Sequence, residues 1–337
     1  MVVTRRALAS SFIGVAMSVA FVLAQAPSNP STPGRSDAQA PARGQAPAPG
    51  PGGRGGGRGP AQGGTGPLKV LFVSKGHPFD REGLFSTLDA LGTEITWTHL
   101  EQPAAELYLD PKNAASYDLF LFYDLDGSQP DRRHNVMAPD GTTKSTWDAP
   151  PIELQRSFKA LLQSGKGIVF LHHALASWVH AWPEYVETMG GACDWFAPLG
   201  TIRGLDYPRS GAFGNTKQHV TVVDKTHPIV QGLGDGFDIV DEAYSCPMFE
   251  ESVHPLLRTD FTPADHDRNL NPKMPFSNLT AWVKTAEISP IVYVQHGHGA
   301  TAWENPQFRQ LLLNAMKWAA SSDARAWAKA HPTKIFK

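Results

Sequence analysis

One short apolar run constrains the fold of this chain more than any other feature. Residues 167–171 read Gly-Ile-Val-Phe-Leu, with no polar side chain between Ile168 and Leu171. Such a run is typical of a strand buried on both faces, as in a parallel sheet covered by helices. His172 and His173 follow it directly. Because ligands of open α/β sheets bind beyond the carboxyl ends of the strands, this pair predicts a functional site, although core histidines are the alternative.

Further apolar runs alternate with segments of helical period. Strands are predicted at residues 68–73, 95–98, 119–123 and 291–295, and helices at 84–91, 151–162 and from Pro306, with Asn305 as its cap. This alternation predicts an α/β fold with a doubly wound, mostly parallel flavodoxin-like sheet. Between residues 192 and 290 the pattern loosens into short strands and Pro/Gly-rich loops, which predicts a β-rich insertion beside the sheet edge.

Several predicted strands end in polar groups that parallel strands would bring to one edge. The groups are His77, Asp124 with Asp126, His172 with His173, and His296 with His298. Neutral imidazoles and carboxylates are ligands for zinc, manganese, iron or nickel, so a divalent metal is predicted, with His172, His298 and Glu242 as its ligands. The chain has no H-x-x-x-H or H-E-x-x-H motif. Hydrogen bonding to a polyhydroxylated ligand, without metal, is therefore the alternative.

A second group of candidate catalytic residues follows the apolar residues 237–240. Asp241 and Glu242 supply carboxylates and Tyr244 a phenol. One acid is a candidate general base, and the tyrosine a candidate proton donor or orienting group. A solvated turn explains the same residues equally well. The predicted catalytic set is thus His172, Asp241, Glu242, Tyr244 and His298.

Aromatic residues near the central run suggest sugar recognition, since aromatic rings stack on sugar faces. The predicted substrate-binding residues are His77, Asp124, His173, Trp178, Trp182 and His296, and Trp195 lies nearby. If these rings bind sugar without turnover, the protein is instead a carbohydrate-binding module on a flexible tether. A glutaminase relative with a histidine in place of its nucleophile is a third, weaker hypothesis.

Other chemistries are disfavoured by what the sequence lacks. No Cys or Ser follows the central run in a nucleophile-elbow setting, and no phosphate-binding loop or dinucleotide fingerprint is present. Covalent acyl transfer and nucleotide cofactors are therefore not expected.

The charge of the predicted domain differs from that of the whole chain. Six of the 30 basic residues and one of the 32 acidic residues precede residue 67, which leaves the remainder with a net charge of −7. An acidic body argues against nucleic acid as a partner.

The first 66 residues indicate export. Residues 1–24 read as a signal peptide, with Arg5-Arg6 before an apolar stretch, and they resemble a twin-arginine signal. Residues 25–66 are rich in Pro, Gly and Ala and predict a disordered linker, which leaves residues 67–337 as the domain. We expect a periplasmic or extracellular protein without a later membrane span; an uncleaved anchor is the alternative. Pairing of Cys193 with Cys246, and the oligomeric state, stay open.

The ordered set of motifs resembles the ThuA-like, or trehalose-utilisation, family. The matching residues are 167–174, 182–185, 190–191, 219–224, 227–228, 231–233, 241–244, 290–294, 297–298, 305–309 and 318–319. The resemblance implies a class I glutamine-amidotransferase-like fold without the amidotransferase cysteine, and a small-molecule carbohydrate as substrate. By position, His172, Asp241, Glu242, Tyr244 and His298 match the family's motifs. The extra His296 and the polar 261–280 loop depart from them.

Together these features predict an enzyme that acts on oxidised (3-keto) glycosides or related sugars. The family's association with such sugars implies isomerisation, elimination or hydrolysis, each beginning with proton abstraction next to a carbonyl. The hypothesis requires that His172, His298 and Glu242 lie within about 15 Å of one another, the span of one small-ligand site.

Overall fold

The computed structural model describes residues 60–126, 132–262 and 277–337. The predicted signal peptide, most of the predicted linker and most of the 261–280 loop lie outside these ranges. The strands are β1 (Gln62–Gly64), β2 (Leu68–Lys75), β3 (Ile95–Glu101), β4 (Leu119–Asp124), β5 (Arg133–Met137), β6 (Thr143–Trp147), β7 (Gly167–Leu171), β8 (Gly200–Ile202), β9 (Leu205–Tyr207), β10 (Gly211–Val222), β11 (Gly236–Ser245), β12 (His254–Thr259), β13 (Leu279–Ala286) and β14 (Ser289–Val294).

Helices connect and cover these strands. The α-helices are α1 (Arg81–Ala90), α2 (Pro111–Ala114), α3 (Ile152–Gln163), α4 (Pro183–Met189), α5 (Ala300–Trp303), α6 (Pro306–Ala319) and α7 (Ser322–Ala330). Short 3-10 helices are η1 (Ala104–Leu109), η3 (His172–Ala176), η4 (Pro228–Val230) and η5 (Glu250–Ser252). The predicted start of α6 is confirmed, because the Asn305 side chain accepts hydrogen bonds from the backbone N–H groups of Gln307 and Phe308. A cap of this kind contributes about 1 kcal/mol.

Ten of these strands form one sheet in the order β1-β3-β2-β4-β7-β14-β13-β12-β10-β11. Strands β3, β2, β4, β7 and β14 pair in parallel. From β14 onward the pairing is antiparallel, through β13, β12 and β10 to the edge strand β11. The β-rich stretch expected between residues 192 and 290 therefore supplies the strands that extend the parallel half of the sheet.

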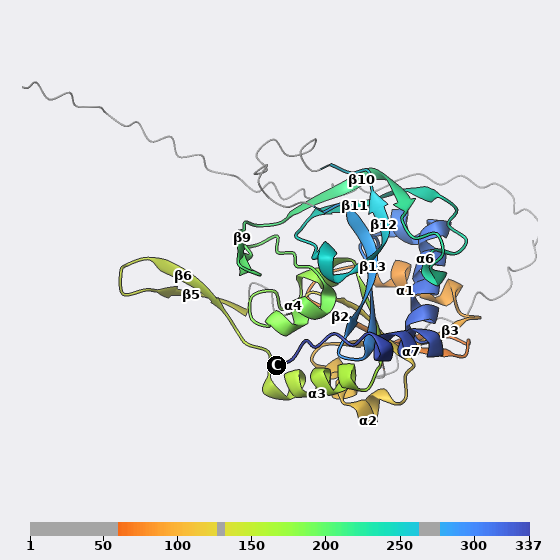
Figure 1. Cartoon of the computed structure of the whole chain (residues 1–337), viewed down its shortest axis with the longest axis horizontal. Helices are drawn as coiled ribbons and strands as arrows, with labels where there is room; N and C mark the ends of the chain where they lie inside the picture. Colours follow the sequence, from red (N-terminus) through yellow and green to blue (C-terminus); the bar gives the residue numbers. More distant parts are fainter. Residues whose placement is uncertain (1–59, 127–131, 263–276) are drawn as a thin grey trace, which may run out of the picture. The chain divides into compact units, whose positions relative to one another are not determined.

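Two apolar layers enclose the sheet, as the doubly wound prediction requires. Side chains of α1, α5, α6 and α7 pack on one face, and those of α3 and α4 pack on the other (Figure 1). Strand β7 contributes to both layers, because Val169 and Leu171 face the first and Ile168 and Phe170 the second. Each of these side chains is fully buried, which stabilises the fold by about 1.5–3 kcal/mol per side chain.

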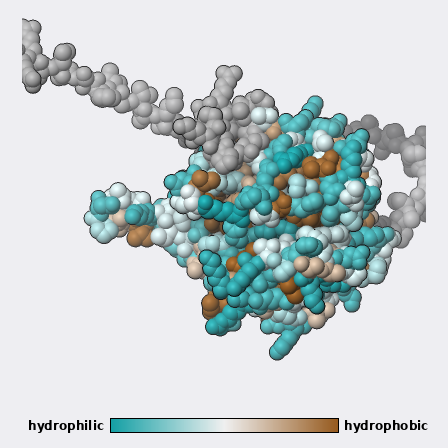
Figure 2. Space-filling view, in the orientation of Figure 1, coloured by the Kyte–Doolittle hydropathy of each residue, from teal (hydrophilic) through white to brown (hydrophobic). Residues whose placement is uncertain are grey.

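Two features were not expected from the sequence. Strand β1 pairs with β3, so the ordered domain begins before residue 67 and the predicted linker boundary at residue 66 is wrong. Strands β5 and β6 form a separate hairpin that projects from the body (Figure 1). The face in Figure 2 is mostly hydrophilic, with apolar patches scattered between polar areas. Among the described residues, no helix has the length and apolar character needed to cross a membrane.

Candidate active site

The candidate site begins where the central strand β7 ends. His172 has a φ of 56°, in the left-handed region that non-glycine residues adopt rarely, at a cost of about 1–3 kcal/mol. Its backbone carbonyl accepts a 2.9 Å hydrogen bond from the Tyr293 hydroxyl, on the neighbouring strand β14. The sharp turn at His172 lies where the nucleophile of a hydrolase elbow would be expected, and it carries an imidazole instead.

The ring of His172 is fixed in one tautomer by a backbone carbonyl. Its Nδ1 lies 2.8 Å from the carbonyl oxygen of Gln295, which can only accept a hydrogen bond. Nδ1 therefore carries the proton, and Nε2 presents a free lone pair when the ring is neutral. Gln295 follows β14, so the pairing of β7 with β14 determines which nitrogen is available for chemistry.

The side chains of His298 and Glu242 lie close to that nitrogen. His172 Nε2 lies 3.2 Å from His298 Nδ1 and 3.4 Å from a carboxylate oxygen of Glu242. His298 Nδ1 lies 3.3 Å from the same Glu242 oxygen. The expectation that these residues share one site is thus confirmed, and we call them the His-Glu-His cluster. It is the one group of three or more His, Cys, Asp or Glu residues in the described ranges with metal-ligand spacing.

Tyr244 closes the cluster on its buried side. Its hydroxyl lies 2.8 Å from His172 Nε2 and 3.3 Å from the Glu242 carboxylate. Both Glu242 and Tyr244 belong to β11, where alternate side chains share a face. The alternative of a solvated turn at residues 241–244 is therefore wrong: these residues are part of the edge strand.

Asp241 points to the other face of β11 and positions the loop that carries His298. Its carboxylate accepts hydrogen bonds from the backbone N–H groups of Gly297 (2.6 Å) and His298 (3.2 Å). The Gly297 carbonyl in turn accepts from the Tyr123 hydroxyl and the Trp303 indole. Burial raises the pKa of Asp241. Asp241 thus positions His298, whereas the other four predicted catalytic residues touch one another directly.

Burial and mutual contacts shift the pKa values of the groups in the cluster. Burial alone would raise the pKa of Glu242, but its contacts with His172 and His298 outweigh burial and hold the pKa well below its usual range. The Glu242 carboxylate raises the pKa of His298 despite partial burial. Desolvation raises the pKa of the Tyr244 phenol well above 10. The cluster therefore presents a permanent carboxylate beside a neutral phenol that can donate a hydrogen bond.

His77 forms the rim of the site. Its ring centroid lies 5.7 Å from that of His298 and 4.7 Å from that of the buried His173. Burial lowers the pKa of His77, and the neighbouring His172 and His298 lower it further. Desolvation holds the pKa of His173 well below its usual value. His77 is therefore a neutral, half-buried imidazole, with His173 behind it.

Most of the predicted substrate-binding residues have no surface with which to contact a ligand. The rings of Trp178 and Trp182 are each only 2% exposed and pack in the core, so their predicted stacking on sugar is wrong. Asp124 (1% exposed) contacts the Ser177 hydroxyl, and His296 is fully buried with its pKa lowered by desolvation to about 3. Direct substrate contact by Asp124, His173 and His296 is therefore not supported. The partly exposed Trp195, whose ring lies 5.0 Å from that of Tyr244, remains beside the site.

Several positioning groups were missed by the sequence reasoning. The Gln295 carbonyl orients His172, and the hydroxyls of Tyr123 and Tyr293 hold the two loops that carry the histidines. Tyr123 and Tyr293 lie near the ends of fully buried runs, where a phenol needs a hydrogen-bond partner. The need of these buried phenols for a partner could have identified both tyrosines from the sequence. The role of the Gln295 backbone carbonyl could not have been identified, because every residue has a backbone carbonyl.

A disulfide joins Cys193 to Cys246, which answers the question that the sequence left open. Cys246 lies two residues beyond Tyr244, and Cys193 is held by a backbone hydrogen bond to Leu175, in the turn after His172. The bond therefore connects the residue after β11 to the segment after α4, which is itself hydrogen-bonded to the turn that carries His172. Disulfides of this kind persist in oxidising compartments.

Comparison with known proteins identifies the family and the fold. The family model described as ThuA, trehalose utilisation, matches residues 69–319. A ThuA-like protein from Parabacteroides merdae aligns with 18% identity over 76% of this chain and 90% of its own, with a TM-score of 0.55. A ThuA-like protein from Bacteroides uniformis aligns with 16% identity over 77% and 93%, with a TM-score of 0.48. No curated protein matches the chain. The predicted α/β fold with a mostly parallel central sheet is confirmed.

Proposed function

Since the chain belongs to the ThuA family of trehalose utilisation, we propose that it is an exported, carbohydrate-processing enzyme that acts on oxidised sugars. Its reaction would begin with proton abstraction next to the carbonyl of a 3-keto glycoside. The His-Glu-His cluster would hold a divalent metal, and Tyr244 and His77 would handle protons beside it.

The observation that carries this proposal is the spacing of the three donor atoms. Ligands about 2.0–2.2 Å from one metal ion lie roughly 3.0–3.5 Å from each other in octahedral or tetrahedral geometry. The distances among His172 Nε2, His298 Nδ1 and Glu242 Oε2 are 3.2, 3.3 and 3.4 Å. The cluster therefore already has the separation that a common ion requires.

The chemistry of the donors fits the same ion. Two imidazoles and one ionised carboxylate suit zinc, manganese, iron or nickel. A metal-binding histidine usually donates its other ring N–H to a carbonyl or carboxylate, as His172 does to Gln295. When bound, such an ion supplies Lewis acidity toward the oxygen of a substrate carbonyl.

The remaining groups would orient the substrate and move the proton. Tyr244 is a neutral donor 2.8 Å from His172 Nε2, so its hydroxyl would hydrogen-bond to an oxygen that develops negative charge. His77 is a neutral imidazole at the rim and would accept the proton from the carbon next to the carbonyl. Glu242, with its low pKa, is a better ligand than base.

Isomerisation, elimination and hydrolysis share this first step, and the cluster suits each of them. Export would agree with the Cys193–Cys246 disulfide. The alternative of a non-catalytic sugar-binding module loses its main support, because the rings of Trp178 and Trp182 are buried.

Incubation of the purified protein with 3-keto-glucosides tests the proposal. The protein would be stripped with chelator and reloaded with zinc, manganese, iron(II) or nickel in separate reactions, and products would be followed by mass spectrometry. We expect turnover that chelator abolishes and one of these metals restores. No product with any of the four metals would refute the proposed function.

A further inference from the structure

The hairpin that projects from the body is not used by the proposed reaction. Strands β5 and β6 form a two-stranded sheet of their own, and none of their side chains is buried. We call residues 132–147 the arm, and Figure 1 shows it extending beyond α3 and α4. A two-stranded hairpin is only marginally stable in water, so the arm gains from contacts outside itself.

The base of the arm is held firmly against the body. The ring of Trp147 stacks on that of His180, with the ring centroids 3.7 Å apart, and His180 is hydrogen-bonded to the buried carboxylate of Asp194. At the start of the arm, Arg132 forms a 3.1 Å ion pair with the buried Asp126. These contacts fix the direction in which the arm leaves the body, so its tip is presented in a defined position.

The tip of the arm is apolar. Val136 and Met137 are adjacent at the end of β5, and their side chains are 52% and 76% exposed. Because neighbouring strand residues point to opposite faces, both faces of the tip carry an apolar side chain. Figure 2 shows an apolar area on the projecting arm. Exposed apolar side chains scattered singly are normal, but two together on a projecting tip indicate a contact surface.

An apolar cavity of about 340 Å³ lies at the base of the same arm. Its apolar lining residues are Val179, Pro183, Val186, Leu199 and Ile202. His180, on which Trp147 stacks, also lines this cavity and so places it at the arm's base. The exposed Leu205, the cross-strand partner of Ile202, extends the apolar surface. We call this cavity the base pocket, and its size leaves room for one or two apolar side chains.

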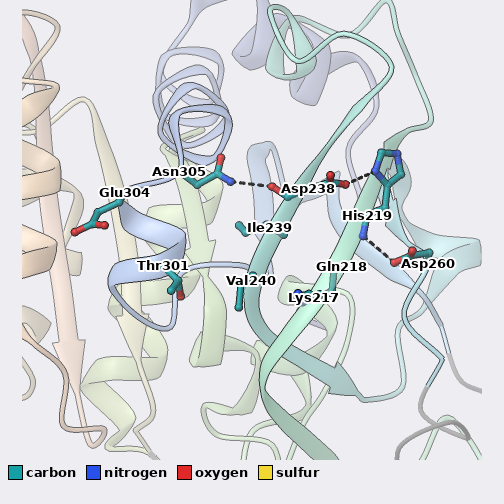
Figure 3. A pocket seen from close by; sticks show the side chains of 10 residues that line it. All are labelled: Lys217, Gln218, His219, Asp238, Ile239, Val240, Asp260, Thr301, Glu304 and Asn305. Carbon is teal, nitrogen blue, oxygen red and sulfur yellow. Dashed lines mark hydrogen bonds and ion pairs between the residues drawn. The ribbon is translucent and has the colours of Figure 1, made fainter.

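A second cavity, of about 620 Å³, fits an apolar tip less well. It is lined by residues of β10, β11 and the region of α5, and charged groups such as Lys217, Asp238 and Glu304 are among them (Figure 3). Asp238 is paired there with His219 at 2.6 Å. An apolar side chain in that cavity would take these polar groups out of water without satisfying them. The base pocket is therefore the better seat for the tip.

The charges of the arm and of the base pocket are complementary. Residues 133–147 carry two bases and one acid. The surroundings of the base pocket include the base Arg203 and three acids, Glu187, Asp206 and Glu251. Opposite charges guide chains together and fix the register of their contact. The arm of one copy thus matches the base pocket of another in both polarity and charge.

We propose that two copies of this chain form a symmetric dimer in which each arm tip enters the base pocket of the other copy. Val136 and Met137 make the apolar contact. The five-residue strands span about 17 Å, at about 3.3 Å per residue. Two arms that lie side by side in opposite directions place each tip at the other's base. The same contact then forms twice, as twofold symmetry requires.

Sedimentation velocity on the purified protein tests the dimer. We expect a monomer–dimer equilibrium whose dissociation constant rises at least about 30-fold in Met137→Glu, because a charge replaces an apolar anchor. Leu107→Glu changes a similarly exposed apolar residue outside the arm and should leave the constant unchanged. Circular dichroism would verify that both variants fold. A wild type that stays monomeric at micromolar concentrations, or a dimer that Met137→Glu does not weaken, would overturn the inference. A monomer that binds anionic lipid vesicles through Met137 would also overturn it and assign the arm to a membrane surface.

Cross-linking tests which surfaces meet. Met137→Cys and Thr201→Cys place thiols at the tip and at the exposed rim of the base pocket, and the two variants would be purified separately and mixed under oxidising conditions. We expect a disulfide-linked dimer from the mixture and none from either variant alone. Met137→Cys mixed with Val223→Cys, at an exposed position elsewhere, should give none. Wild-type dimers together with no cross-link in the first mixture would show that a different interface holds the copies together.

Discussion

His172 Nε2 lies 3.4 Å from the carboxylate of Glu242, although one residue ends a parallel strand and the other belongs to the antiparallel edge of the sheet. The contact depends on the loop after β14, which carries His298 between them. The two halves of the sheet therefore meet at the cluster, and changes in either half should affect it.

Tyr244→Phe should lower turnover and leave metal binding intact. The substitution removes the hydroxyl 2.8 Å from His172 Nε2 and keeps the buried ring. Loss of one such proton donor reduces kcat about 100-fold. Tyr185→Phe, in the core away from the cluster, is the matched control and should keep full activity. Unchanged kcat in Tyr244→Phe would contradict the assigned role.

Asp241→Asn should weaken metal binding through a displaced His298. The carboxylate holds two backbone N–H groups, at Gly297 and His298, and an amide would present its own N–H groups to one of them. Loss of a group that orients a ligand lowers metal affinity about 10- to 100-fold. Metal titration of this variant against Asp238→Asn, whose side chain is exposed, measures the effect; equal affinities would show that Asp241 does not position the loop.

Removal of the Cys193–Cys246 disulfide should lower the stability of the domain. The bond closes a segment with a sequence separation of 53, and on the entropic model this contributes about 4 kcal/mol. Urea unfolding of the wild type with and without reductant, and of the double serine variant, measures the difference. Reductant should have no further effect on the variant. Coincident unfolding curves for the oxidised and reduced wild type would contradict the prediction.

Asp124 should make the domain less stable as pH rises from about 4 to about 8. Burial, together with the nearby Asp126, raises the pKa of Asp124 to about 8. The folded state then binds more protons than the unfolded state in this window, so the stability contributed by protonated Asp124 is complete below pH 3.8 and is lost as pH passes 8.

The variant Asp124→Asn removes this titration and tests whether Asp124 makes stability fall as pH rises. Its free energy of unfolding should fall less between pH 5 and pH 8 than that of the wild type, by up to a few kcal/mol, since one pKa unit is worth about 1.4 kcal/mol. Glu153→Gln, at an exposed site, should show the same change in the free energy of unfolding between pH 5 and pH 8 as the wild type. If Asp124→Asn also showed the wild-type change, Asp124 would not titrate in this range.

The parallel half of the sheet and its histidines were predictable because buried strands leave unbroken apolar runs. Ile168 to Leu171 indicated a strand, and the position of His172 after it followed from topology. Strand β1 left no such trace, since Gln62–Gly64 contains no apolar side chain. The hairpin β5–β6 had a turn signal at residues 139–141, but its strands are largely exposed and its sequence lacks a buried face.

It was harder to predict which residues near the site can contact a ligand. The burial of each side chain depends on packing between elements that are far apart in the sequence. Trp178 and Trp182 lie only six and ten residues beyond His172, yet they pack against the α3 side of the sheet. His296 and His298 are two residues apart, and only His298 reaches the surface, because the Gly297 φ of 131° turns the chain between them. Neither outcome could be read from residue type or spacing.

Metal content provides the most direct test of the central claim, that His172, Glu242 and His298 share one divalent ion. The wild type, Glu242→Gln, His298→Ala and the control His254→Ala, whose histidine is exposed, would be purified with the same metal and measured by plasma mass spectrometry. The account predicts about one ion per chain in the wild type and control, and little in the two cluster variants. A wild type that binds no zinc, manganese, iron or nickel, or cluster variants that bind as much as the wild type, would contradict it.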